Sequence, residues 1–155
     1  RDAGTWFVPT IVVSHPATAD FFEGIGSPPW YMERRAAVGR QHWDALRMAI
    51  EEDVKIALGT DGLPFKPADD TTWLVREAEY YVEAGMTPLQ ALQSATLRTA
   101  EMLDADEDTG TLRAGSYADI VALTANPLKN ISALRSIDFV MKGGRVYRDD
   151  GGIAR

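Results

Sequence analysis

The sequence Val54-Lys-Ile-Ala-Leu-Gly-Thr-Asp-Gly62 is a short apolar run that stops abruptly at an aspartate and a glycine. Its aliphatic residues predict a strand over 54–60 that is buried on both faces, and Asp-Gly is a common turn dipeptide. The stretch Thr5–Val13 has the same near-continuous apolar character and predicts a second strand, with irregular pairing expected at Pro9. Strands buried on both faces are typical of parallel sheets, so the two runs indicate an α/β protein.

Three helical patterns accompany these strands. Apolar residues recur at helical spacing in Gln41–Asp53, Thr71–Ala84 and Thr87–Leu103. The stretch 14–39 contains Gly24, Gly26 and a Pro-Pro pair, and it predicts a long loop with short helical turns. Residues 1–104 therefore have the order β-loop-α-β-α-α, which is typical of consecutive units of a (β/α) barrel.

The ends and faces of two of these helices carry specific signals. Thr87-Pro-Leu-Gln90 predicts a helix start, with a threonine cap, proline in the first turn and a glutamine that can complete a capping box. Asp69 or Asp70 can cap the helix before it. The buried stripe expected on that earlier helix consists of Leu74, Ala78, Tyr81 and Val82.

The pattern changes after Asp104. Short strands alternating with turns are expected at 110–112, 118–123, 139–141 and 145–148. Gly143-Gly144 is a two-residue hairpin turn between the last two. We therefore expect two parts: residues 1–104 from the last units of a barrel, and residues 105–155 as a small, mostly β tail.

Composition excludes several classes of function. The 155 residues carry a net charge of −7, which argues against nucleic acid and anionic membranes as partners. The absence of cysteine excludes disulfides, thiolate nucleophiles and zinc sites built on cysteine. The sequence opens without Met and almost inside a strand, so we expect a piece of a longer protein. The lack of a signal-peptide layout and of cysteine favours a cytoplasmic location.

Asp61 is the best candidate for a residue that carries chemistry. It lies where a buried strand ends, and the carboxyl ends of the strands form the active-site face of (β/α) barrels. A carboxylate there can bind a cation or transfer a proton, although it can also simply cap the turn beside Gly62. His15 follows the other strand and could face the same site, but a lone histidine is weak evidence for a metal. His42 is expected to pack or to lie at the surface.

The loop before the first helix is rich in aromatic and cationic residues. These are Phe21, Phe22, Trp30, Tyr31, Arg34 and Arg35. They could line a substrate entrance, where an arginine would hold a carboxylate through paired hydrogen bonds. Packing of the loop with solvated charges is the simpler interpretation of the same residues.

The series of motifs resembles the amidohydrolase superfamily over about Gly4 to Tyr147. Residues 54–62 look like its eighth strand, and Ala84-Gly-Met-Thr-Pro-Leu-Gln-Ala-Leu-Gln-Ser-Ala-Thr96 looks like a helix that follows it. Residues 110–123 and 140–147 are similar to strands of its small β-sandwich. The resemblance is closest to the imidazolonepropionase-like and Xaa-Pro dipeptidase-like branch. It implies the C-terminal part of a (β/α)8 TIM-type barrel followed by part of a β-sandwich.

The resemblance also implies an activity and a cofactor. Asp61 matches the aspartate that contacts the metal and passes a proton from the attacking water to the leaving amine. The implied reaction is hydrolysis of a C–N bond in an amide, cyclic amide or dipeptide, through a water activated by a divalent metal. Zinc is the expected metal, with one or two ions, and the expected substrate is a small molecule or resembles a dipeptide. A variant of this hypothesis keeps the family but changes the reaction to deamination or to opening of a cyclic amide.

The sequence departs from the family pattern in its metal ligands. The family needs an HxH pair, a carboxylated lysine or a glutamate, and two further histidines, none of which is present. An eight-stranded barrel needs roughly 250 residues, so this sequence cannot close one. The alternative is therefore a non-catalytic fragment or truncated relative that acts as a folding or interaction module. In either case we expect a homo-oligomer, or dependence on a missing N-terminal part.

Overall fold

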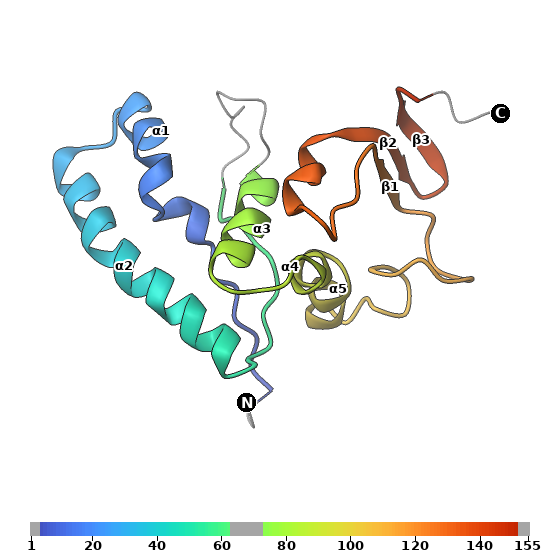
Figure 1. Ribbon diagram of the computed structural model, residues 1–155, viewed down its shortest axis with the longest axis horizontal. Coiled ribbons are helices and arrows are strands. Elements are labelled where there is room, and N and C mark those ends of the chain that lie inside the picture. The colour runs from blue at the N-terminus through green and yellow to red at the C-terminus, as the bar shows by residue number, and fades with distance from the viewer. Residues whose placement is uncertain (1–3, 63–72, 152–155) are drawn as a thin grey trace.

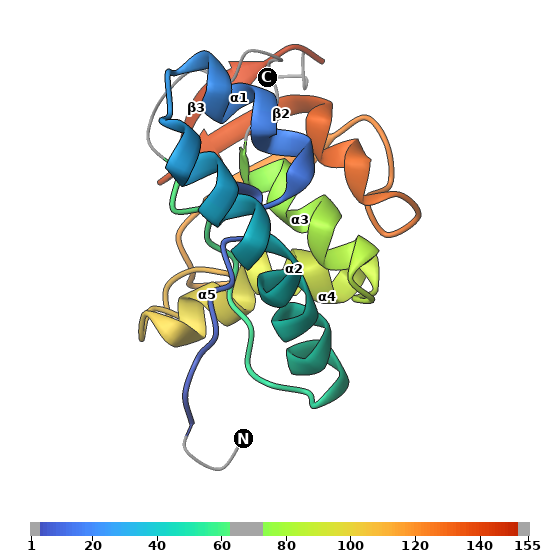
Figure 2. The same cartoon turned by 90° about the vertical axis from the view of Figure 1, so that its left-hand side faces the viewer.

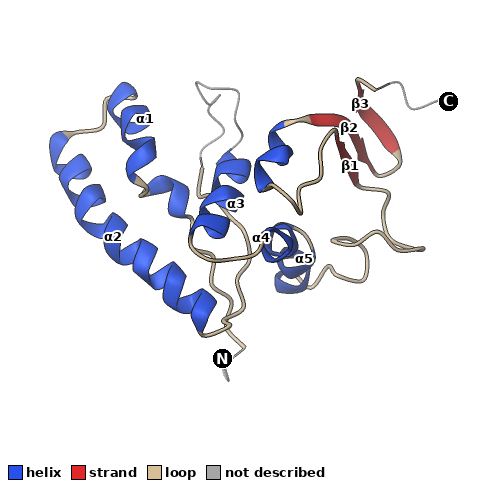
Figure 3. Ribbon diagram, viewed as in Figure 1, coloured by secondary structure: helices blue, strands red, loops and turns tan. Residues whose placement is uncertain are grey.

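The computed structural model describes residues 4–62 and 73–151 as an α/β fold with a small antiparallel sheet. Figure 3 shows helices through most of the chain and strands only in its last part. The α-helices are α1 (Ala19–Gly24), α2 (Pro29–Glu51), α3 (Trp73–Glu83), α4 (Pro88–Ala95) and α5 (Leu97–Met102). Three 3₁₀ helices, η1 (Ile11–Val13), η2 (Pro16–Thr18) and η3 (Ile131–Arg135), and the strands β1 (Ile120–Leu123), β2 (Ile137–Lys142) and β3 (Arg145–Asp149) complete the described elements.

The two strands expected at 5–13 and 54–60 are reduced to one parallel bridge between Phe7 and Ile56. The Phe7 amide donates to the Lys55 carbonyl at 2.9 Å, and the Ala57 amide donates to the Phe7 carbonyl at 3.1 Å. The ladder stops there because Pro9 has no amide hydrogen and Thr10 turns into the left-handed region, at φ 49°. The expectation of two full strands was therefore wrong in extent, although the two segments are parallel.

Helix α2 begins twelve residues earlier than the helix expected at Gln41, because it starts at Pro29. Proline is well suited to the first turn of a helix, since its missing amide hydrogen would have no partner there. The loop expected over 14–39 is consequently confined to its first half, which forms η2 and α1.

The capping box at the start of α4 is confirmed. The Gln90 amide donates to Thr87 Oγ1 at 3.2 Å, and the Thr87 amide donates to Gln90 Oε1 at 2.8 Å. The helix expected to run on to Leu103 instead breaks at Thr96, whose φ and ψ are −128° and −92°. Near the break, hydroxyl groups of threonine replace backbone donors: Thr99 Oγ1 donates to the Ser94 carbonyl at 2.7 Å.

The sheet has the order β1-β2-β3, and both neighbouring pairs are antiparallel. Gly143 and Gly144 join β2 to β3 with φ of 56° and 78°, as a two-residue hairpin turn requires. The hairpin expectation is confirmed, whereas 110–112 forms bends and turns rather than a strand.

Helix α3 is central to the molecule. In Figure 1 it lies between the long helix α2 on one side and the β1–β3 sheet on the other, and Figure 2 shows α2 lying in front of α3 and α4 when the molecule is viewed from that side. The core around α3 includes Ile11, Leu46, Ile56, Ala78 and Tyr81, all buried.

The buried face of α3 differs from the expected stripe at one position. Leu74 was expected in its buried stripe but is 56% exposed, and Val75 is buried instead. The caps expected at Asp69 or Asp70 lie outside the described residues. None of the helices in the described ranges is long and apolar enough to cross a membrane.

Candidate active site

The parallel bridge defines one edge of the molecule where two segments end together. Phe7 and Ile56 are paired in parallel, so the residues that follow them, Thr10 and Asp61, lie toward the same side. The segments approach closely, since a Cβ built on Gly59 would lie only 2.6 Å from Val8 Cγ1. This edge corresponds to the carboxyl ends of parallel strands, where α/β proteins place their ligands.

Asp61 lies at this edge with an exposed side chain. Its backbone is in the left-handed region at φ 46°, a conformation that most non-glycine residues avoid. The turn is tightened by Thr60, whose Oγ1 accepts from the Gly62 amide at 3.1 Å. Aspartate tolerates this conformation better than most residues, and Asp53 and Asp104 adopt it as well, at φ 51° and 54°.

An aromatic cluster of Phe21, Phe22, Tyr31 and Trp73 adjoins the Asp61 turn. A Cβ on Gly62 would lie 2.8 Å from Trp73 Cε3, so the indole ring lies directly against this turn. The Phe21 and Trp73 rings meet edge to face, with 4.9 Å between their centres, and the ring centres of Phe22 and Tyr31 are 5.7 Å apart. These aromatics lie on α1, α2 and α3 rather than in a loop, and they pack on one another beside the candidate site, while Trp30 is 65% exposed.

Arg35 is a buried structural group and not a free cation at a substrate entrance. Its Nε donates to the Val13 carbonyl at 2.9 Å, and its Nη2 donates to the His15 carbonyl and to Thr18 Oγ1. The guanidinium also lies 4.8 Å from the centre of the Phe22 ring. These contacts support the packing interpretation for Arg35, whereas Arg34 is exposed.

The two histidines are structural. The His15 ring stacks on Tyr80 at 4.0 Å, and its Nδ1 accepts from the Ala17 amide at 3.2 Å. Burial lowers the pKa of His15 below its usual value. His42 Nδ1 lies 2.7 Å from Ser14 Oγ in a hydrogen bond, and burial lowers the pKa of this ring too. Neither histidine contacts Asp61, and the packing expected for His42 agrees with this bond.

Glu77 is the residue that the sequence analysis missed. It is fully buried on α3, where its Oε1 accepts from the Ile11 amide and its Oε2 from the Val12 amide, both at 2.8 Å. Burial raises the pKa of Glu77 to about 7, and the hydrogen bonds from the two amides and from Tyr81 oppose that rise. The available signal was its spacing from Tyr81, which places both residues on one face of the helix.

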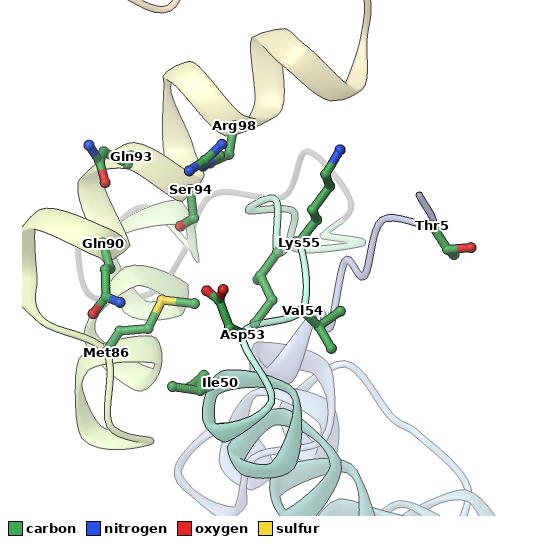
Figure 4. Close-up of a pocket in the computed structure, with 11 residues that line it drawn as sticks. Thr5, Ile50, Asp53, Val54, Lys55, Met86, Gln90, Gln93, Ser94 and Arg98 are labelled. Carbon is green, nitrogen blue, oxygen red and sulfur yellow. The ribbon is translucent and has the colours of Figure 1, made fainter. Parts of the chain in front are cut away.

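A pocket of about 350 Å³ lies at the opposite ends of the two segments. Figure 4 shows Asp53, Lys55 and Arg98 around it, together with polar side chains of α4. It is lined by Thr5, Ile50, Asp53, Val54, Lys55, Ile56, Met86, Gln90, Gln93, Ser94 and Arg98. Because Asp53–Lys55 precede the bridge and Asp61 follows it, this pocket does not contain Asp61. We place the candidate site at Asp61, because the geometry of parallel segments directs ligands to their carboxyl ends.

The donor set for a metal is limited. Among residues 4–62 and 73–151, no three His, Asp or Glu side chains lie together in a way that could hold a metal ion. Asp61 would therefore supply only one metal ligand from the described residues, whereas protein sites for zinc use roughly three or more protein ligands.

Residues 16–147 match the Amidohydrolase family, and the chain belongs to this family. Ochratoxinase of Aspergillus niger is 33% identical over 97% of this chain and 31% of its own length. Imidazolonepropionase of Shouchella clausii is 29% identical over 68% of this chain and 24% of its own length. A solved structure of a Xaa-Pro dipeptidase with bound methionine in the active site superposes with a TM-score of 0.81 at 36% identity, over 95% of this chain and 35% of that chain.

These matches confirm the resemblance found in the sequence and identify the fold as that of part of an amidohydrolase. The chain spans about a third of the length of these relatives, since the ochratoxinase match covers 31% and the dipeptidase match 35% of their chains.

Proposed function

We propose that this chain is the C-terminal portion of a hydrolase that cleaves a C–N bond, in an amide, a cyclic amide or a dipeptide. The observation that carries the proposal is the placement of Asp61, with an exposed side chain, after the carboxyl end of a parallel segment. The relatives named ochratoxinase, imidazolonepropionase and Xaa-Pro dipeptidase support this class of reaction and a small or dipeptide-like substrate.

The two parts of the chain receive separate roles in this proposal. Residues 1–104 form the last β/α units of a TIM-type barrel, and residues 105–155 form strands of a small β-sandwich. The parallel pairing of Phe7 with Ile56 supports the first assignment, and the antiparallel β1–β3 sheet supports the second. A homo-oligomer, or dependence on further N-terminal residues, remains a prediction.

Asp61 is proposed as the group that moves the proton. Its carboxylate is exposed, so it can accept a proton from an attacking water and return it to the leaving amine. The family resemblance also implies a divalent metal, with zinc expected and one or two ions, of which Asp61 would be a ligand. The described residues do not fit a metal site by themselves, so the other ligands would have to come from elsewhere in the protein.

The test replaces Asp61 in the full protein that contains these residues. Asp61→Asn keeps the size and tolerates the left-handed backbone but removes the basic carboxylate. We expect turnover of an amide or dipeptide substrate to fall by about 100-fold or more, and the content of bound metal to decrease. Asp104→Asn is the matched control, because Asp104 is also an exposed aspartate with positive φ, at 54°. Unchanged turnover by Asp61→Asn would contradict the assignment.

The wild-type protein provides the test of the reaction class. Hydrolysis of a panel of N-acyl amino acids, dipeptides and cyclic amides supports the proposal. A full protein that is folded, binds no metal and hydrolyses none of them would instead be the non-catalytic module that the sequence also allows.

A further inference from the structure

Helix α3 carries two fully buried polar side chains, Glu77 and Tyr81, one helical turn apart. Neither is exposed, since the relative accessibility of both is 0%. Residues four apart lie on the same helix face, so both side chains point toward the two parallel segments. Each segment is contacted by one of them.

Glu77 holds the first segment just after its end. The amides of Ile11 and Val12 donate to the two carboxylate oxygens, each at 2.8 Å. These residues follow Thr10, whose positive φ of 49° turns the chain out of the extended conformation. The loop that leaves the first segment is therefore held to α3 by two hydrogen bonds to the Glu77 carboxyl group.

Tyr81 holds the second segment. Its hydroxyl donates to the Ala57 carbonyl at 3.3 Å, four residues before Asp61. The Tyr81 hydroxyl also neighbours the Glu77 carboxyl group, so the two contacts lie side by side on α3. Ala57 is itself bonded to the first segment, because its amide donates to the Phe7 carbonyl at 3.1 Å.

A purely structural packing contact would not need these groups. A buried carboxylate loses its hydration, and well-packed apolar residues of similar volume are often as stable or more stable at such positions. A carboxylate here instead satisfies two successive backbone amides, which an apolar residue would leave without acceptors. The Glu77 carboxyl group therefore fixes the backbone of Ile11 and Val12 by supplying acceptors that an apolar residue would lack.

We propose that Glu77 and Tyr81 are positioning residues, which together set the place of the Asp61 turn relative to the loop that follows the first segment. This inference rests on the proposed function, because the geometry matters for turnover only if Asp61 takes part in the reaction. Neither residue touches the candidate site, so both act through the backbone of the two segments.

The experiment compares three variants of the full protein, Glu77→Gln, Tyr81→Phe and Glu79→Gln. Glu77→Gln keeps the size of the side chain but replaces one acceptor oxygen with an NH₂ group that opposes an amide hydrogen. Tyr81→Phe keeps the ring and removes only the hydroxyl. Glu79→Gln is the control on the same helix, because Glu79 pairs with Arg135 in η3 and contacts neither segment.

The readouts are kcat and KM at a temperature well below unfolding, together with hydrogen–deuterium exchange of peptides that cover residues 7–18. Displacement of a catalytic group by less than about 1 Å can reduce turnover by roughly 100-fold. We therefore expect kcat to fall by about 10- to 100-fold in Glu77→Gln with little change in KM, and to fall less in Tyr81→Phe. The Ile11 and Val12 amides should exchange faster in Glu77→Gln and at the wild-type rate in Glu79→Gln.

Several results would overturn the inference. Wild-type kcat in both Glu77→Gln and Tyr81→Phe would show that the pair does not position the site. A loss of kcat in Glu79→Gln equal to that in Glu77→Gln would indicate general destabilisation of α3. Should Glu77→Gln fail to fold, Tyr81→Phe still tests positioning through the second segment, at the Ala57 carbonyl. If the wild type hydrolyses no substrate, the proposed function fails. Separately, unchanged hydrogen–deuterium exchange of residues 7–18 in Glu77→Gln would show that Glu77 does not hold the first segment in place.

Discussion

The helical part of the chain and its β tail differ in how completely they bury their own residues. In residues 4–104, excluding the undescribed 63–72, Leu46 and Tyr81 are fully buried, and the buried Glu77 accepts hydrogen bonds from the Ile11 and Val12 amides. In the tail, every residue of β3 is exposed. Large apolar side chains exposed there are Leu112, Tyr117, Val121, Leu128, Val146 and Tyr147. The helical part therefore supplies most of the core, to which η3 adds Ile131, whereas every residue of β3 lies at the surface.

Removing one leucine from each part should give the largest contrast. Leu46 is 0% exposed in α2, and Leu112 is 80% exposed in the tail. We expect Leu46→Ala to lower the free energy of unfolding by about 2–5 kcal/mol, because it leaves a cavity. Leu112→Ala should change it by less than about 0.5 kcal/mol. Urea unfolding followed by tryptophan fluorescence measures both, and equal losses would mean that the tail leucine is buried in the full protein.

Changing pH should affect the helical part more than the tail. The pKa of Glu77 is about 7 in the folded protein against an ordinary value of 4.5, because burial disfavours the charged form. Its contribution to stability is therefore fully present below about pH 4.5 and is lost as the pH rises through about 7. The loss amounts to about 3 kcal/mol, at roughly 1.4 kcal/mol per pKa unit.

Unfolding midpoints measured across this pH range check the expectation. In Glu77→Gln the decline between about pH 4.5 and 7 should disappear, because the amide does not ionise. Glu79→Gln provides the comparison: contacts with Arg135 outweigh burial and hold the pKa of Glu79 below its usual range. A decline of the same size in Glu77→Gln and wild type would assign it to another group.

The smallest free-energy contribution that we predict is that of the ion pair between Arg135 and Glu79, where the tail meets the helical part. Arg135 of η3 donates from Nε to Glu79 Oε1 on α3 at 2.8 Å, and from Nη2 to Oε2 of the same carboxylate. The pair is partly exposed, so its coupling free energy should be about 0.2–1 kcal/mol. A double-mutant cycle with Arg135→Gln and Glu79→Gln measures it, and the coupling should weaken in high salt. A coupling well above this range would show that the tail is attached more firmly than its exposed surface suggests.

Signals that depend on neighbouring residues were predicted well from the sequence. The capping box between Thr87 and Gln90 and the hairpin turn at Gly143-Gly144 both form as expected. Each is specified within four residues, because the interacting groups are linked by the local backbone. The local sequence Asp61-Gly62 likewise indicated where the second segment ends, although its pairing with Phe7 depends on a distant partner.

Features that depend on distant partners were predicted less well. The stretches 5–13 and 54–60 have the composition of strands, but a strand needs paired neighbours, and these two share a single bridge. Glu77 was missed because nothing in its local sequence shows that backbone amides 65 and 66 residues away would be its partners. Its role is visible only when burial and hydrogen bonding are considered together.

The separation between Glu77 and Ile11 also has a consequence for the order in which the protein forms. The two residues are 66 positions apart, so the Ile11 amide waits for its acceptor until the intervening chain has been made. At a synthesis rate of about 5–20 residues per second, this wait lasts on the order of 3–13 seconds. During that time the apolar first segment has no docking partner on α3, and closing so long a loop is entropically costly. The end of the first segment should therefore be among the last parts of the helical region to become ordered on the ribosome.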